Sequence, residues 1–92
     1  MPTERRSELI KRNGGRFTGR QWRRLCALYG DRCLACGRRE PDVHLTADHV
    51  VPLALGGRHA IRNLQPLCWP CNQEKGKAVV DYRESTLHGC TA

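Results

Sequence analysis

Four cysteines in two pairs are the residues of this 92-residue chain whose spacing most strongly indicates chemistry. Cys33 and Cys36 form one C-x-x-C pair, Cys68 and Cys71 form another, and 31 residues separate the two pairs. A two-residue spacer lets both sulfurs of a pair reach one ion from a tight turn, and two pairs complete a tetrahedral zinc site. Disulfides and buried free thiols are the alternatives. We expect a structural zinc, because four protein ligands leave no position open for substrate.

A second set of polar residues, rich in Asp, His and Asn, lies between and beside the two cysteine pairs. They occur in the segments Asp48-His49-Val50-Val51-Pro52-Leu53, Gly56-Gly57, Asn63-Leu64-Gln65-Pro66-Leu67-Cys68 and Cys71-Asn72-x-x-Lys75-Gly76. Together with the cysteines, this pattern over residues 33–77 resembles the HNH endonuclease family, in its small free-standing form found in phages and prophages. The resemblance implies a ββα-metal (HNH or His-Me finger) fold and a nuclease that uses a divalent cation besides the zinc.

The resemblance also gives each of these polar residues a role. It implies that His49 is the general base, that Asp48 and Asn72 hold a catalytic Mg²⁺ or Mn²⁺, and that Asn63 braces the loop and helps to orient the histidine. Carboxylate and amide oxygens suit such hard cations, and an imidazole with a pKa of about 6.5 accepts protons near neutral pH. The final motif position is Asn rather than His, which favours harder metals over zinc or nickel.

Each of these residues also has a purely structural interpretation. His49 could be a hydrogen-bonded core histidine, Asn63 could cap a turn, and Asn72 could be a residue of a first helical turn. The complete pattern favours the catalytic interpretation for His49 and Asn72. For Asn63 the two interpretations nearly coincide, since its implied role is itself structural. Cys26 is expected to be a core residue and Cys90 is given no role.

The positive charge of the chain is concentrated in its first part. Residues 1–39 hold eleven Lys and Arg against three Asp and Glu, whereas residues 40–92 hold five against six. This asymmetry indicates a polyanion such as DNA as the partner, although a solvated, solubilising surface would have the same composition. The basic residues predicted to contact nucleic acid are Arg20, Arg23, Arg24, Arg58, Lys75 and Lys77.

A helix and a basic arm are expected before the cysteine module. Residues 8–11 can form one short helical turn, which the following Asn and two glycines end. Thr18 and Gln21 form a capping-box pattern, so a helix is predicted over residues 18–29. Its apolar side chains recur at helical spacing on one face, opposite three arginines.

Strands and a second helix are expected within the module. Residues 45–51 and 63–67 are suited to strands, and Pro70 is suited to the first turn of a helix. Neighbours on a regular strand point to opposite faces. Asp48 and His49 can therefore share a cleft only if the strand ends or bulges near His49.

We therefore predict a single α+β domain, a small zinc-stapled ββα-metal fold with a preceding basic helix. Residues 1–17 are expected to be a basic flexible arm, 18–84 the nuclease domain, and 85–92 a frayed tail. Within the nuclease domain, the helix occupies residues 18–29 and the zinc-clamped ββα module occupies 33–80. A core this small needs the support of a metal.

The predicted function is metal-dependent cleavage or nicking of DNA, with Zn²⁺ as a structural ion and Mg²⁺ or Mn²⁺ as the catalytic one. The expected partners are DNA and, from the resemblance to small phage proteins, terminase or other genome-packaging proteins. No apolar run is long enough for a signal peptide or a membrane span, so we expect the protein in the cytoplasm of a bacterial or phage-infected host cell. No heptad pattern or large apolar patch indicates a dimer, so a monomer is expected. The alternative is a non-catalytic zinc-bound module that binds nucleic acid or a packaging partner.

Overall fold

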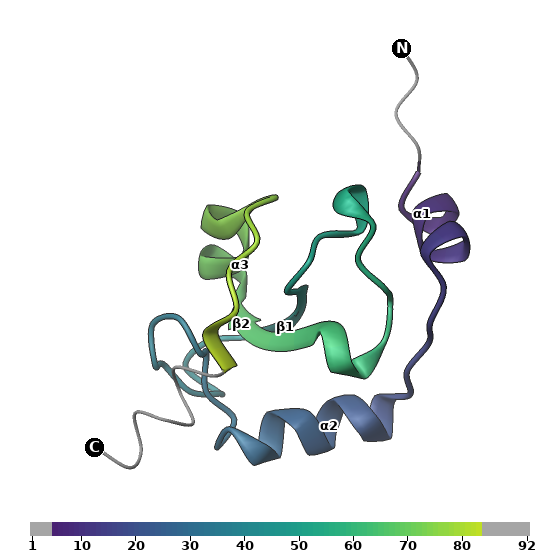
Figure 1. Cartoon of the computed structure of the whole chain (residues 1–92). Helices are drawn as coiled ribbons and strands as arrows, with labels where there is room; N and C mark the ends of the chain where they lie inside the picture. Colours follow the sequence, from purple (N-terminus) through teal and green to yellow (C-terminus); the bar gives the residue numbers. More distant parts are fainter. Residues whose placement is uncertain (1–4, 84–92) are drawn as a thin grey trace.

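A computed structural model of the chain describes residues 5–83. These residues form three α-helices and one two-stranded antiparallel sheet, in the order α1 (Arg6–Asn13), α2 (Gly19–Leu28), β1 (Leu45–His49), β2 (Leu64–Cys68) and α3 (Trp69–Lys75). Two 3₁₀ turns, Leu53–Leu55 and Ile61–Asn63, lie in the loop between the strands. The predicted α+β fold, with β1, β2 and α3 consecutive, is confirmed (Figure 1). Within the described part of the chain, no helix has the length and apolar character needed to cross a membrane.

Helix α2 begins with the predicted capping box. The hydroxyl of Thr18 accepts a hydrogen bond from the backbone N–H of Gln21 at 3.1 Å, and the Gln21 side chain accepts one from the Thr18 N–H at 2.8 Å. The first of these bonds satisfies an amide that no carbonyl within the helix can reach. Cys26 and Tyr29 are buried beneath the helix. The arginines of its outer face are exposed, namely Arg20, Arg23 and Arg24.

Helix α1 is longer than the single turn expected, and it packs against the loop between the strands. It spans eight residues and contacts the 3₁₀ turn at Leu53–Leu55. At its end, the Asn13 side-chain amide donates to the carbonyl of Leu53 at 2.8 Å and to that of Gly57 at 2.9 Å. These bonds anchor the helix that lies within the predicted arm. The tail predicted over residues 85–92, Cys90 included, lies outside the described residues.

The strands form a short hairpin that ends at the candidate site. Their antiparallel register places Asp48 opposite Gln65 and His49 opposite Leu64. Strand β1 stops at His49 instead of continuing through the predicted residue 51, so the strand end that the alternation of side chains requires is present. Every residue of β2 is buried, and this strand contacts both α2 and α3, which lie on different sides of the hairpin in Figure 1.

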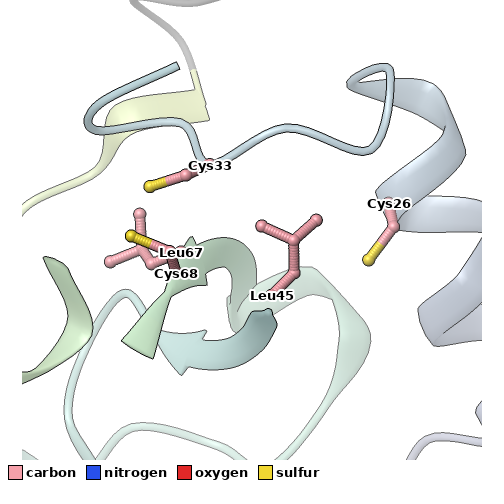
Figure 2. Packing of buried hydrophobic residues seen from close by; sticks show 5 residues of the cluster. All are labelled: Cys26, Cys33, Leu45, Leu67 and Cys68. Carbon is pink, nitrogen blue, oxygen red and sulfur yellow. The ribbon is translucent and has the colours of Figure 1, made fainter. Parts of the chain in front are cut away.

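The core is small, and cysteines occupy part of it. Leu45 and Leu67 of the sheet pack with Cys26 of α2 and with Cys33 and Cys68. In Figure 2 the sulfurs of Cys33 and Cys68 lie near one another beside Leu67, whereas Cys26 extends from α2 on the other side of Leu45. Because so few apolar side chains are buried, a metal bound by the sulfurs of Cys33 and Cys68 would supply much of the folding free energy.

Candidate active site

The four cysteines of the predicted zinc site lie together. Their sulfurs are all within 4.8 Å of one another, and Cys36 Sγ is 3.8 Å from Cys68 Sγ. Four thiolates around a zinc ion at about 2.3 Å have tetrahedral edges of about 3.8 Å, whereas a disulfide holds its two sulfurs about 2.0 Å apart. No described cysteine is in a disulfide. The cluster can therefore hold a metal ion such as zinc through four protein ligands.

The thiols of the cluster differ in how readily they ionise. Burial raises the pKa of Cys71, and the neighbouring thiols raise it further. Burial opposes ionisation of Cys33 too, but hydrogen bonds from the backbone of Cys68, Cys36 and Ala35 outweigh it and lower the pKa of Cys33 to about 7. One thiol of the cluster thus ionises readily while another resists, and a divalent cation would favour the thiolate form of all four.

Asp48 is held in place by two partners on other elements. Its Oδ2 accepts a hydrogen bond from Gln65 Nε2 at 2.8 Å and lies 3.2 Å from the Lys75 ammonium. The ammonium also donates to the His49 carbonyl at 3.1 Å. The side chains of Asp48 and Lys75 are only 5% and 1% exposed, and charges this deeply buried are tolerated only when paired. The pair commits Oδ2 and leaves Oδ1 of Asp48 as its other acceptor.

His49 is buried at the end of β1, with its ring against a second imidazole. Its Nε2 lies 3.0 Å from Nδ1 of His59, and the two rings stack with centroids 5.2 Å apart and planes inclined by 29°. Burial lowers the pKa of His49 to about 4, and the positive charges of Arg6 and Lys75, and of His59 when it is protonated, contribute in the same direction. The ring is therefore neutral near pH 7, and only the neutral ring can accept a proton.

Asn63 closes the loop that follows His49. Its Oδ1 accepts a hydrogen bond from the Val51 N–H at 3.0 Å, and its Nδ2 donates to the carbonyls of Val51 at 3.0 Å and Arg58 at 2.9 Å. The Asn63 carbonyl in turn accepts from the Val50 N–H at 2.8 Å. These four bonds join the two ends of the loop next to the candidate base.

The loop closed by Asn63 requires a glycine at position 57. A Cβ there would lie 1.6 Å from the Val51 carbonyl oxygen and 2.9 Å from Asn63 Nδ2. Gly57→Ala should therefore separate Asn63 from Val51 and lower the free energy of unfolding by about 1–3 kcal/mol or more, measured by chemical denaturation. Gly19→Ala is the control, because its Cβ would meet only a flexible arginine tip at 3.5 Å and alanine favours a helix. Equal stability of the two variants would contradict the proposed close approach.

Three of the four predicted catalytic residues line one open pocket of about 380 Å³. Asp48 and His49 come from the end of β1, and Asn72 comes from α3. The Asn72 amide nitrogen donates to the Thr46 hydroxyl at 2.9 Å, so its carbonyl oxygen is the atom left for a ligand. A carboxylate oxygen and an amide oxygen on the same pocket are the donors that suit a hard divalent cation such as Mg²⁺ or Mn²⁺. Helix α1 contributes Arg6 to this pocket as well.

The basic residues predicted to contact DNA occupy different surroundings. Lys77 lines the pocket with Asp48 and His49. Arg58 lines a second pocket, of about 470 Å³, together with Arg16 and Arg62. The three α2 arginines, although exposed, line neither pocket. Lys75, for which a phosphate contact was also predicted, has a buried ammonium that is paired with Asp48.

Three residues of the site were not expected from the sequence, namely Arg6, His59 and Gln65. Gln65 could have been found from strand pairing, since it lies directly opposite Asp48. The histidine is brought to His49 by the glycine loop, and the arginine by the packing of α1, and neither has a local sequence signal. The site is therefore assembled from α1, the hairpin, the loop between the strands and α3.

The comparison with known families agrees with this arrangement. A family model described as HNH endonuclease matches residues 33–87, which is more than half of the chain and includes all four clustered cysteines and the three motif positions at 49, 63 and 72. No curated protein and no solved structure gave a significant match.

Proposed function

The chain belongs to the HNH endonuclease family, and from that premise we propose that it hydrolyses phosphodiester bonds of DNA in a reaction that requires Mg²⁺ or Mn²⁺. The observation that carries the proposal is the shared pocket, which brings Asp48, His49 and Asn72 to one open surface from two different elements. A module that only binds nucleic acid has no need of a carboxylate, a neutral imidazole and an amide in this arrangement.

Asp48 and Asn72 are the residues that would hold the catalytic cation. Each has one atom already engaged, by Lys75 and Gln65 in the first case and by Thr46 in the second, so each is restrained to offer its remaining oxygen. When bound there, the cation would stabilise the negative charge that develops on the phosphate. Zn²⁺ is proposed for the cysteine cluster, because four thiolates are the ligands that a structural zinc site uses.

His49 would act on the water that attacks the phosphorus. Its Nε2 is engaged by His59, so Nδ1 is the nitrogen available to take the proton. The water oxygen forms a bond to phosphorus, and the bond from phosphorus to the 3′ oxygen breaks. The 3′ oxygen leaves with the bonding electron pair and takes a proton from solvent, so the products carry a 5′-phosphate and a 3′-hydroxyl. Arg6 and Lys77 line the same pocket and supply positive charge for the phosphate.

The substrate is proposed to be DNA because of the concentrated positive charge of residues 1–39 and of the residues that line the two pockets. One active site per chain cuts one strand at a time, so nicking by a monomer is the expected activity. We further propose the cytoplasm as its location and phage genome-packaging proteins such as terminase as its protein partners. The proposed packaging partners come from the resemblance to small free-standing phage members of the family.

The direct test is nicking of supercoiled plasmid in the presence of Mg²⁺ or Mn²⁺, followed by gel electrophoresis. Asn72→Ala should abolish nicking and weaken Mn²⁺ binding by about 10-fold or more, as measured by calorimetry. Gln73→Ala is the matched control, since it is the exposed next residue of the same helix. Asp48→Ala is a less suitable variant, because it would leave the Lys75 ammonium buried without its partner and so destabilise the fold.

Two outcomes would overturn the proposal. Wild-type protein that binds DNA but does not nick it with either cation would be a binding module. Nicking by Asn72→Ala at the rate of Gln73→Ala would mean that this pocket does not hold the catalytic cation.

A further inference from the structure

The second imidazole beside His49 is fixed by contacts of its own. The His59 backbone N–H donates to the Gly14 carbonyl at 3.0 Å, just after α1. Its ring lies against Phe17, with centroids 4.8 Å apart and planes inclined by 55°. The residue before it is held by Asn63, which donates to the Arg58 carbonyl. His59 is therefore held against His49 by the segment that follows α1 and by Asn63 at the end of the loop between the strands.

The hydrogen bond between the two rings bears directly on which nitrogen of His49 can accept a proton. A neutral imidazole carries one N–H proton, so one ring nitrogen is a hydrogen-bond donor and the other is an acceptor. If Nε2 of His49 carries the proton and donates to His59 Nδ1, the lone pair on His49 Nδ1 is free. If His59 Nδ1 donates instead, the His49 proton must be on Nδ1, and neither nitrogen can act as a base.

Other groups near His49 cannot take this orienting role. Oδ2 of the adjacent Asp48 is already shared by Lys75 and Gln65. Arg6 and Lys75 act on the ring as positive charges, and neither can accept a proton. Among the described residues, His59 is the hydrogen-bond partner of the His49 ring.

We propose that His59 is a positioning residue, which accepts a hydrogen bond from His49 Nε2–H and so keeps Nδ1 of His49 free to take the proton of the attacking water. The inference rests on the proposed nuclease function, since His49 needs this tautomer only if it is the base. The arrangement has the logic of an orienting group behind a catalytic histidine, with a neutral ring in place of the usual carboxylate or carbonyl. It also gives α1 a part in the site, because this helix leads into the backbone contact at Gly14.

The tautomer can be measured without cleavage, by long-range ¹H–¹⁵N NMR of the histidine rings in the zinc-loaded full chain. Wild-type His49 should show a protonated Nε2 and a bare Nδ1. His59→Phe keeps the ring packing and removes the acceptor, so His49 should become a mixture of tautomers. His59→Asn places an amide oxygen near the former Nδ1 and should restore the wild-type signature. His44→Phe is the control, because the side chain of His44 is 84% exposed.

Kinetics supply the second readout. At saturating Mn²⁺ and DNA, His59→Phe should nick plasmid about 10- to 100-fold more slowly than wild type with unchanged DNA affinity, and His59→Asn should recover most of that loss. Protonation of His49 at Nδ1 in the wild type, or wild-type rates for His59→Phe, would overturn the inference while leaving the nuclease intact. Absence of nicking by the wild-type protein itself would instead overturn the proposed function, and the inference with it.

Discussion

Replacing His49 with alanine should slow nicking by about 10²- to 10⁴-fold, which is the usual contribution of a general base. The imidazole is buried at the edge of the pocket. Nδ1 is its available acceptor in the proposed tautomer, and no other neutral base among the described residues lines that pocket. The cysteine cluster and Asn72 do not depend on the His49 side chain for any hydrogen bond. Zinc content, DNA affinity and most of the affinity for Mn²⁺ should therefore be retained.

The comparison is made on plasmid at saturating Mn²⁺, with circular dichroism and zinc content shown to equal those of the wild type. His44→Ala is the control, since it removes a histidine of the same module whose side chain is exposed. Comparable nicking by His49→Ala and wild type would mean that His49 is not the base, and the catalytic interpretation would lose its central residue.

The lowered pKa of His49 also changes the pH dependence that an ordinary histidine would give. A base with a pKa of about 6.5 loses activity as the pH falls through that value. Burial and neighbouring positive charge lower the pKa of His49 to about 4, so its neutral form persists well below neutral pH. The ratio of the wild-type rate to the His49→Ala rate should therefore stay constant between about pH 6 and 8, and should fall only as the pH approaches 4.

The parts of the molecule that could be predicted from the sequence depend on local chemistry. The capping box at Thr18 and Gln21 specifies where α2 begins, because both of its hydrogen bonds form within a single turn. Each C-x-x-C pair likewise brings two sulfurs together through a tight turn, whatever lies between the pairs. The end of β1 at His49 followed from requiring that two neighbouring side chains face one cleft.

The parts that could not be predicted depend on contacts between distant segments. Lys75 has the sequence context of a surface lysine, and only the packing of α3 against β1 buries it beside Asp48, 27 positions earlier in the chain. Arg6 lies in a segment whose composition is typical of a flexible arm. Its place in the pocket depends on the docking of α1, which two hydrogen bonds from Asn13 secure. Neither contact can be recognised from the residues adjacent to Lys75 or Arg6 in the sequence.

Loss of one cysteine of the cluster should have the largest effect on stability of any single substitution. Of the nine buried apolar side chains among residues 5–83, three are Cys26, Cys33 and Cys68, so the core is thin and two of its members belong to the four-cysteine cluster. Zinc bound by four thiolates contributes about 10–16 kcal/mol to the folding of small zinc domains, which is as large as the total stability of a typical domain. Cys68→Ser should therefore lose both zinc and the cooperative unfolding transition.

Cys26→Ser is the matched control for this prediction. It makes the same thiol-to-hydroxyl change at a buried position of the same cluster, but Cys26 lies outside the four-sulfur site. Its cost should be limited to burying a hydroxyl, about 1–3 kcal/mol, with one zinc per chain retained. The measurements are elemental analysis and circular dichroism during thermal unfolding, with and without a strong chelator. If Cys68→Ser bound one zinc and unfolded at the same temperature as Cys26→Ser, the four cysteines would not be the metal site. We expect a strong chelator to abolish the circular dichroism signal of the folded wild-type protein. An unchanged signal after chelation would also contradict a zinc-dependent fold.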